Sequence, residues 1–272
     1  MLWGEEMRTA SVIEKWYIQL GFNSKYDEEF YAALNTIEIP ADTSIANYDL
    51  ECADGKKNLL AFLYMCDALE KKYAQYGISN EILLDTLSDI VRWCDVWSDI
   101  KGDLYLGEIS WLSRSMNFNL FQLGRLQYCI HEVTEKFTGY GMKLGESFIG
   151  VHIPSIGPLR AEEVCASLDT AREFLAKYFP QVEYSYFSCL SWLLDDTLKE
   201  MLPQDSNILK FAEMFTIVDN MPSDSILHYV FGCNVKRENI DCQQCKSSFA
   251  RKVKSAVQEG RVFYQPRGLI AK

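Results

Sequence analysis

The sequence predicts an α+β protein, with a helical domain over residues 1–117 followed by a mixed-sheet domain over residues 118–272. In the first domain, apolar residues follow helical spacing through most of residues 5–100, and only four of the 15 glycines lie before residue 100. In the second domain, residues 147–190 form the pattern of a strand, a crossover helix and a second strand. Two parallel strands require such a crossover, which places a parallel pair inside the predicted sheet.

Composition indicates a globular protein with a substantial core, because 48% of the 272 residues are hydrophobic and 13% are aromatic. The net charge of −11 is unevenly distributed, with 8 basic and 18 acidic residues in residues 1–100. Residues 232–272 hold 9 basic and 3 acidic residues. This overall acidity argues against a nucleic-acid partner, although the basic end can attract a small polyanion.

The cysteines and the N-terminal residues predict a cytoplasmic protein. The nine cysteines lie mostly inside apolar runs, as small reduced core residues do. The first ten residues are acidic and lack the basic and apolar stretches of a secretory leader. No run approaches the ~18 apolar residues that a membrane helix needs, so no membrane partner is expected.

The expected helices of the first domain are set by apolar spacing and by glycine stops. Gly21 and Gly77 each follow an apolar periodic segment and fit helix C-caps. Pro40 and several Asp and Asn residues predict a loop over residues 37–55. The expected helices cover residues 7–20, 24–34, 58–76, 79–97 and 109–116.

The second domain begins with strand-forming residues over 119–130. A strand over 148–153 ends at Pro154, which cannot donate to a ladder, and a helix over 161–178 leads to a strand over 184–190. Further elements follow these. They are a helix over 193–202, a strand over 207–218 where apolar residues step by two, a short apolar element over 226–231, a basic helix over 246–258 and a strand-like tail over 262–264.

The loop after the first of these strands is a candidate anion site. Open N–H groups at a helix start bind phosphate, and an arginine adds a guanidinium. The alternative is a simple turn between a strand and a helix. The candidate cofactor-binding residues are Val151, Ile153, Ser155, Ile156, Gly157 and Arg160.

Three side chains near the strand ends are candidates for proton transfer. His152 can act as a general base, or it can be an outward-facing strand residue. Cys189 and Ser191 share one face of the following strand and are candidate acids, while the alternative for Cys189 is a packed core thiol.

Two further features have weaker functional interpretations. Cys242 and Cys245, with Cys233 upstream, resemble the start of a zinc site, but zinc normally takes four ligands and no second pair or nearby histidine completes it. No metal is therefore expected. The basic residues of the C-terminal helix can attract cofactor phosphates, or they form a solvated face.

Four short motifs carry a resemblance to a known family. They are LFQLGRLQ at 120–127, VHIPSIGPL at 151–159, CLSWLL at 189–194 and SNI at 206–208. In their order and spacing, the chain resembles a bacterial, clostridial-type family of acyltransferase-like proteins. That family joins a helical N-acyltransferase N-terminal domain to a C-terminal domain of the GNAT (N-acetyltransferase-like) superfamily.

The resemblance implies an N-acyltransferase that uses acetyl-coenzyme A or another acyl-coenzyme A, with the amine of a small molecule or peptide as acceptor. It further implies that pantetheine lies between two splayed strands, here 148–153 and 184–190, and that the pyrophosphate is bound by the loop 154–160. This loop, PSIGPLR, departs from the usual glycine-rich form because it has one glycine and two prolines, which lack N–H groups. An inactive GNAT-fold binding or regulatory module is therefore the alternative.

Overall fold

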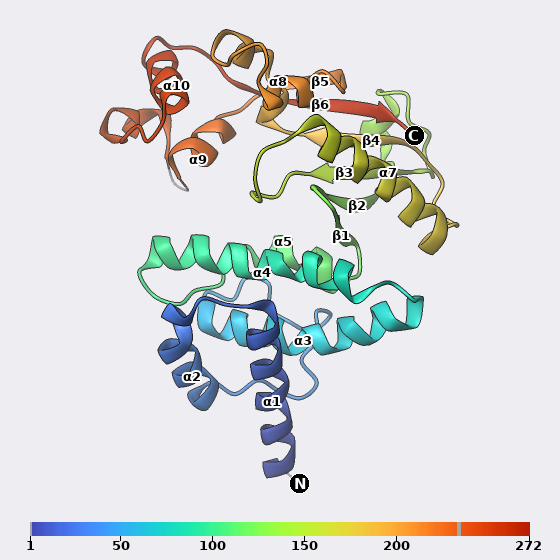
Figure 1. The fold of residues 1–272 in the computed structure, drawn as a ribbon, viewed down its shortest axis with the longest axis vertical. Coiled ribbons are helices and arrows are strands. Elements are labelled where there is room, and N and C mark those ends of the chain that lie inside the picture. The colour runs from blue at the N-terminus through green and yellow to red at the C-terminus, as the bar shows by residue number, and fades with distance from the viewer. Residues whose placement is uncertain (1, 233–234) are drawn as a thin grey trace. The chain divides into compact units, whose positions relative to one another are not determined.

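The computed structural model describes residues 2–232 and 235–272, with side chains from Thr9 onward. It divides into two compact units, each described here by itself. The first runs up to Leu123 and includes residues 127–129, and the second comprises residues 124–126 and 130–272. Figure 1 shows the helices and strands in chain order.

The first unit is helical, as predicted. Side chains cap two of the helix starts, because Asp54 accepts the N–H of Lys57 and Ser79 accepts that of Ile82. Gly77 ends a helix in the left-handed conformation with φ 69°, as the sequence indicates. The helices are α1 (Leu2–Leu20), η1 (Ser24–Tyr26), α2 (Asp27–Thr36), α3 (Gly55–Tyr76), α4 (Asn80–Lys101) and α5 (Ile109–Met116).

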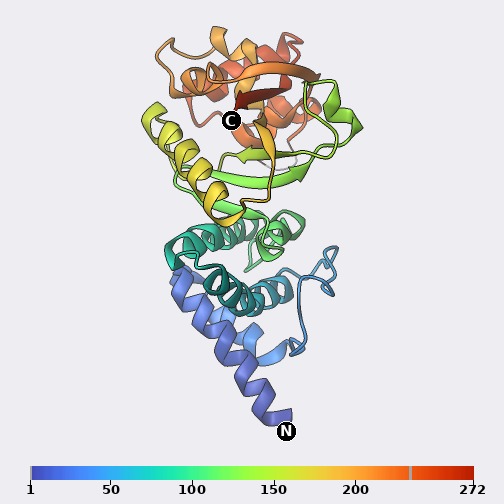
Figure 2. The same ribbon diagram turned by 90° about the vertical axis from the view of Figure 1, so that its right-hand side faces the viewer.

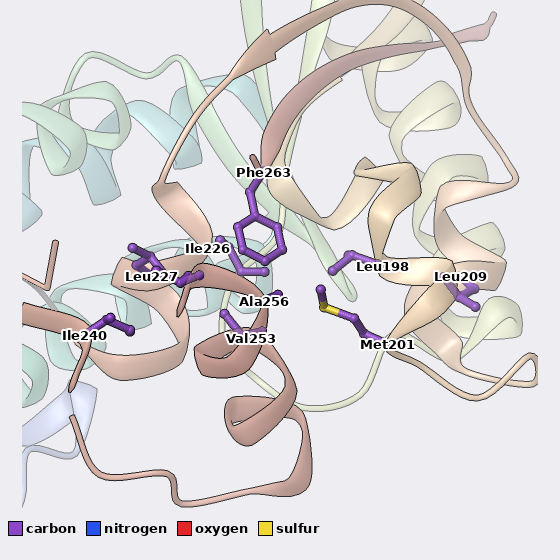
Figure 3. Close-up of a cluster of buried hydrophobic side chains, with 10 residues drawn as sticks. Leu198, Met201, Leu209, Ile226, Leu227, Ile240, Val253, Ala256 and Phe263 are labelled. Carbon is purple, nitrogen blue, oxygen red and sulfur yellow. The ribbon is translucent and has the colours of Figure 1, made fainter. Parts of the chain in front are cut away.

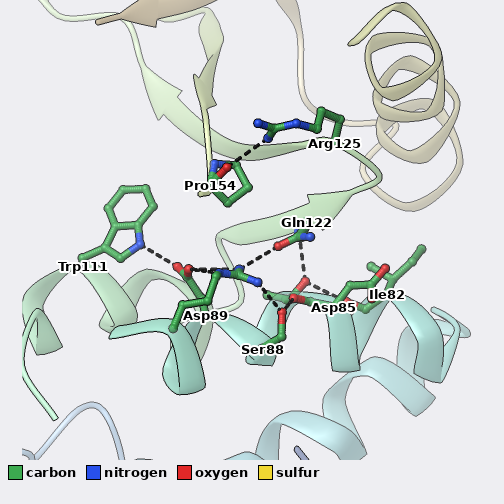
Figure 4. Close-up of polar contacts among 10 residues, drawn as sticks. Ile82, Asp85, Ser88, Asp89, Trp111, Gln122, Arg125 and Pro154 are labelled. Atoms are coloured by element: carbon green, nitrogen blue, oxygen red, sulfur yellow. Dashed lines mark hydrogen bonds and ion pairs between the residues drawn. The ribbon is translucent and has the colours of Figure 1, made fainter. Parts of the chain in front are cut away.

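A buried carboxylate organises the polar contacts of α4 in this unit. Asp89 is 4% exposed. It accepts the indole N–H of Trp111 at 2.8 Å and pairs with Arg92 at 3.0 Å. Arg92 in turn donates to the Oε1 atom of Gln122 at 2.8 Å, so that one carboxylate fixes side chains from three segments (Figure 4). Such a network is stabilising only while every member keeps its partner.

We expect Asp89→Ala to lower the free energy of unfolding by about 2 kcal/mol, because the Trp111 indole and the Arg92 guanidinium lose a buried acceptor. Urea denaturation followed by circular dichroism measures this change. Asp85→Ala is a matched control, since that exposed carboxylate lies one turn earlier on α4 and its loss should change stability by less than about 0.5 kcal/mol. Equal effects of the two substitutions would contradict the assignment of Asp89.

The second unit is built on the mixed sheet that the sequence predicts. The strand order of the whole sheet is β1-β2-β3-β4-β6-β5. Strands β3 and β4 are parallel and are connected through α7, whereas β6 is antiparallel to both β4 and β5. The strands of this sheet are β1 (Leu120–Leu123), whose residues belong to the first unit, β2 (Leu126–Glu132), whose residues are divided between the units, β3 (Ser147–His152), β4 (Tyr184–Leu190), β5 (Thr216–Pro222) and β6 (Tyr264–Ala271).

Different segments cover the two faces of this sheet. Helix α7 (Ala161–Tyr178) packs on one face, where the guanidinium of Arg172 lies over the ring of Phe187. The segment 133–146, which contains α6 (Glu135–Thr138), covers the other face through a buried cluster. Figure 2 shows α7 in yellow and this segment in light green on opposite sides of the sheet. The cluster consists of Val133, Met142, Phe148 and Leu269.

Three of the expected elements of the second unit differ from the structure, one of them the strand expected over 262–264, which begins only at Tyr264 and runs to Ala271 as β6. The strand expected over 207–218 was wrong, because Asn207–Ala212 is a helix, α8, and the strand lies further on at Thr216–Pro222. Phe211 and Phe215 are both buried, and a spacing of four residues satisfies a helix as well as an alternating strand. The helix expected over 193–202 is a pair of short 3-10 helices, η2 (Trp192–Leu194) and η3 (Asp196–Glu200), each begun by a capping side chain.

The remaining C-terminal elements enclose a second hydrophobic cluster. They are α9 (Ser225–Phe231), η4 (Arg237–Cys242) and α10 (Ser248–Gln258). Figure 3 shows Phe263, just before β6, pointing between side chains of these helices and of η3. The cluster comprises Leu198, Met201, Leu209, Ile226, Leu227, Ile240, Val253, Ala256, Val257 and Phe263.

Candidate functional site

The two parallel strands of the second unit separate at their C-terminal ends. The pairing of β3 with β4 ends at Gly150 and Ser188 among the described residues. Both strands nevertheless continue, β3 to His152 and β4 to Leu190. Strand β4 stays paired with β6 as far as Leu190. Strands β3 and β4 are therefore paired with each other along their first residues but not at their C-terminal ends, among the described residues.

His152 is the last residue of β3 and lies at this divergence beside a second histidine. The ring of His131, on β2, is 6.5 Å from the ring of His152, and it stacks on Phe148 at 4.9 Å. Gly150 makes room for both imidazoles, because a Cβ atom there would lie 2.8 Å from the Nε2 atom of His131 and 3.2 Å from that of His152. A glycine inside a strand often marks such a close approach.

The structure does not bring Cys189 to the face on which His152 lies. Ser188 is the residue paired with Gly150, and side chains alternate along a strand, so Cys189 points to the face covered by α7. Its thiol is 1% exposed, and burial raises its pKa to about 12. Cys189 therefore remains protonated at neutral pH.

Ser191 lies immediately beyond β4 in a fixed position. Its N–H donates to the carbonyl of Pro266 at 3.1 Å, and its Oγ atom accepts the N–H of Leu193 at 3.2 Å. Because the hydroxyl accepts this bond, its own hydrogen can be donated elsewhere.

The loop between β3 and α7 presents most of the predicted cofactor-binding residues to solvent. Ser155, Ile156 and Gly157 are exposed, and Arg160 is an exposed residue at the start of α7. The guanidinium of Arg160 pairs with Glu163 one turn into the helix, at 2.7 Å. The two residues predicted on the strand side are less accessible, since Val151 is buried and Ile153 is partly buried. The structure thus places the predicted set along one continuous segment.

A buried arginine that was not among the predicted site residues donates hydrogen bonds to carbonyl groups of this loop. Arg125, in the turn between β1 and β2, is 8% exposed. Its guanidinium donates to the carbonyl oxygens of Pro154, Gly157 and Pro158. The residue lies inside the LFQLGRLQ motif, but a turn arginine next to a glycine is ordinarily solvent-exposed. Only the tertiary structure shows that it is buried.

A pocket of about 420 Å³ adjoins Arg125 and the first half of α7. The lining residues are Gly124, Arg125, Ile156, Glu163, Ala166, Ser167 and Thr170.

A second buried arginine lies on the same sheet face as His152. Arg267, on β6, is paired with Leu190 and is 9% exposed. It donates to the Oγ atom of Ser188 at 3.0 Å and lies 4.9 Å from the ring of Phe137. Its Nε atom is buried without a hydrogen-bond partner in the described structure, and burial lowers the pKa of the guanidinium. The sequence gives no indication of this arginine, because its burial depends on β6 being an interior strand.

Among the described residues, the C-terminal cysteines and basic side chains show no arrangement that points to a ligand. Cys242 is exposed and Cys245 partly exposed, while Cys233 lies outside the described residues. Several of the basic side chains contact the protein itself, since Lys252 donates to the carbonyl of Met201 and Lys254 to that of Asp241. These contacts support a structural role for α10.

A mixed sheet whose central parallel strands diverge, followed by a loop and a long helix, defines a GNAT-type domain. Comparison with family models agrees with this class and confirms the two-domain arrangement that the resemblance implied. The chain belongs to the family of the GNAT-like C-terminal domain, whose model matches residues 120–270. A model of the N-acyltransferase N-terminal domain matches residues 24–118.

Solved acyltransferase structures are similar to this chain over most of its length. One, in complex with decanoyl-CoA and teicoplanin, has 27% identity and a TM-score of 0.71, and the match covers 79% of this chain and 66% of that one. Another, in complex with decanoyl-CoA, has 28% identity and a TM-score of 0.69, covering 78% and 65%. A mutant in complex with octanoyl-CoA has 26% identity and a TM-score of 0.71, covering 79% and 66%.

The chain therefore spans about two thirds of the length of these acyltransferases. No curated protein matches the sequence. Among the residues that the structure describes, no helix has both the length and the apolar character needed to span a membrane.

Proposed function

We propose that this protein is an N-acyltransferase that transfers an acyl group from acyl-coenzyme A to the amine of a small molecule or peptide. The divergence of β3 and β4, with His152 at its edge, is the observation that carries this proposal. The family membership supports it, as do solved relatives in complex with decanoyl-CoA, octanoyl-CoA and teicoplanin.

The residues present fit an acyl-coenzyme A donor. Backbone groups of Val151 and Ile153 lie at the diverging strand edge, where they can bind the amides of pantetheine as a neighbouring strand would. The exposed loop at Ser155–Gly157 leads to the N-terminus of α7, an 18-residue helix whose first N–H groups favour an anion. Arg160 adds a positive charge there, which in the free protein is paired with Glu163.

In this proposal the protein orients the amine and the thioester, and its side chains transfer the protons of the reaction. Bound acyl-coenzyme A supplies the activated thioester. His152 accepts a proton from the amine, whose nitrogen forms a bond to the carbonyl carbon as the carbon–sulfur bond breaks. Backbone N–H groups near residues 151–153 polarise the carbonyl oxygen. Of the two candidate acids, Ser191 is the one assigned to supply a proton to the departing sulfur, because the Cys189 thiol is buried on the face covered by α7.

Thermal unfolding in the presence of coenzyme A esters tests this proposal. A ligand at 100 times its dissociation constant should raise the free energy of unfolding by about 2.7 kcal/mol. We expect coenzyme A, acetyl-coenzyme A and longer acyl esters to raise the melting temperature, and release of free thiol to require an added amine. No rise with any ester at millimolar concentration would contradict donor binding. A rise without thiol release from any amine would favour the inactive binding module, which the two prolines of the loop leave as the second candidate.

A further inference from the structure

The loop between β3 and α7 is held by a single buried guanidinium. In Arg125, the Nη1 atom lies 3.0 Å from the carbonyl oxygen of Pro154, and Figure 4 shows this bond. The Nη2 atom lies 2.6 Å from the oxygen of Gly157, and the Nε atom lies 3.0 Å from that of Pro158. Three carbonyl groups of one five-residue segment are therefore directed at the same side chain.

These contacts fix the direction of the loop's N–H groups. In a trans peptide the C=O and N–H bonds point in opposite directions, and the described chain contains no cis peptide. Because the carbonyls of Pro154 and Pro158 point toward Arg125, the N–H groups of Ser155 and Leu159 point away from it. The carbonyl of Gly157 belongs to the peptide bond with Pro158, which has no N–H group to direct.

The two prolines therefore occupy positions where their missing N–H groups are not needed. Each contributes a carbonyl to Arg125, and the residue after each contributes an N–H group on the opposite side. In the described structure the guanidinium has no carboxylate within ion-pair distance, although the Glu163 carboxylate acts on it electrostatically, and its three hydrogen bonds go to these carbonyls. A positive charge behind a carbonyl makes the N–H group of the same peptide a better donor.

Arg125 is itself anchored from the side of α7. The N–H of Leu126 donates to the Oγ atom of Ser167, a buried residue of α7, at 3.1 Å. Gly124 turns the chain before Arg125 with φ 70°, a conformation that favours glycine. The guanidinium thus extends from a turn that is fixed to the helix following the loop.

We propose that Arg125 is the positioning residue of the donor site, which directs the N–H groups of Ser155 and Leu159 away from the guanidinium to bind the pyrophosphate of coenzyme A. In this sequence it replaces the closely spaced glycines that give other phosphate-binding loops their shape. This inference rests on the proposed function for the identity of the ligand. The hydrogen bonds between Arg125 and the loop are present in the protein without any ligand.

Arg125→Lys tests the proposal, because a lysine retains the charge but cannot reach three carbonyls with one planar group. We expect coenzyme A to bind the variant at least about tenfold more weakly by titration calorimetry, equivalent to about 1.4 kcal/mol. Binding of pantetheine, which has no pyrophosphate, should not change. In turnover, KM for acetyl-coenzyme A should rise by a larger factor than kcat falls.

The matched control is Arg172→Lys, the same substitution on α7 at a residue that pairs with Asp169 at 2.8 Å and lies outside the loop. It should bind coenzyme A as the wild type does. Amide NMR of the wild-type protein gives a measurement that does not depend on a variant folding. Coenzyme A should shift the N–H signals of Ser155 and Leu159, and pantetheine should not.

These experiments distinguish failure of the role of Arg125 from failure of the proposed function. If the wild type binds coenzyme A but Arg125→Lys binds it equally well, or if the two amide signals do not respond, the role of Arg125 is overturned and the proposed function stands. If the wild type binds no coenzyme A at 1 mM, both proposals are overturned. Equal weakening of coenzyme A and pantetheine binding would indicate general damage to the fold and would also count against a role specific to the pyrophosphate.

Discussion

Replacement of His152 by Gln should reduce kcat for acyl transfer by about 10²–10⁴-fold, the contribution that a positioned general base ordinarily makes. The glutamine amide fills similar space at the end of β3 but cannot accept the proton of the attacking amine. The dissociation constant for coenzyme A should change little, because the proposed donor contacts are made by backbone groups and by the following loop. Steady-state release of thiol, combined with calorimetric titration of coenzyme A, separates the two effects.

The chain has three histidines, and the two other than His152 provide the controls for this experiment. His228→Gln makes the same chemical change on α9 and should leave kcat unchanged. His131→Gln removes the imidazole beside His152 and should have a smaller effect than the loss of His152 itself. If His152→Gln retained wild-type kcat at saturating donor and acceptor, the assignment of His152 as the base would be incorrect.

Replacement of Phe263 by Ala should lower the free energy of unfolding by about 3–5 kcal/mol, the usual cost of removing a large aromatic side chain from a core. Phe263 is fully buried at the centre of the second hydrophobic cluster (Figure 3). The surrounding residues come from several helices that also pack against one another. The cavity left by the substitution can therefore close only in part. Denaturation by urea, monitored by circular dichroism, measures the loss.

Tyr229→Ala is the control for that substitution. It removes an aromatic ring of similar size from α9 in the same unit, but Tyr229 is 65% exposed. Its replacement should lower the free energy of unfolding by less than about 1 kcal/mol. A loss at Phe263 no greater than the loss at Tyr229 would show that the cluster does not stabilise the C-terminal elements.

The parts of the fold that follow from local sequence were predictable. Gly77 ends a helix and Pro154 ends a strand because of their own backbone restrictions, whatever surrounds them. The strand, helix and strand over 147–190 therefore agreed with the structure. The segment 207–218 was assigned wrongly because Phe211 and Phe215 fit both periodicities, and which one applied depended on distant packing partners.

The candidate site was predictable only where it is continuous in sequence. His152 and the loop after it were identified because they follow a strand and precede a helix. Arg125 and Arg267 were not, because each is buried by partners far away in the chain, with Arg125 bound to residues about 30 positions later and Arg267 to a serine 79 positions earlier. Local patterns carry no information about such contacts, and an isolated arginine is ordinarily assumed to be exposed.

The position of β6 within the sheet has a consequence for how the second unit is synthesised and folds. It is the last strand in sequence, yet it lies between β4 and β5, and its pairing with β4 joins residues as distant as Tyr186 and Ala271. Until β6 has emerged from the ribosome, β4 and β5 each present an unpaired edge that can associate with other chains. Pairing over so long a separation also slows folding. The sheet of the second unit therefore keeps these edges exposed for longer than a sheet whose strands pair in chain order would.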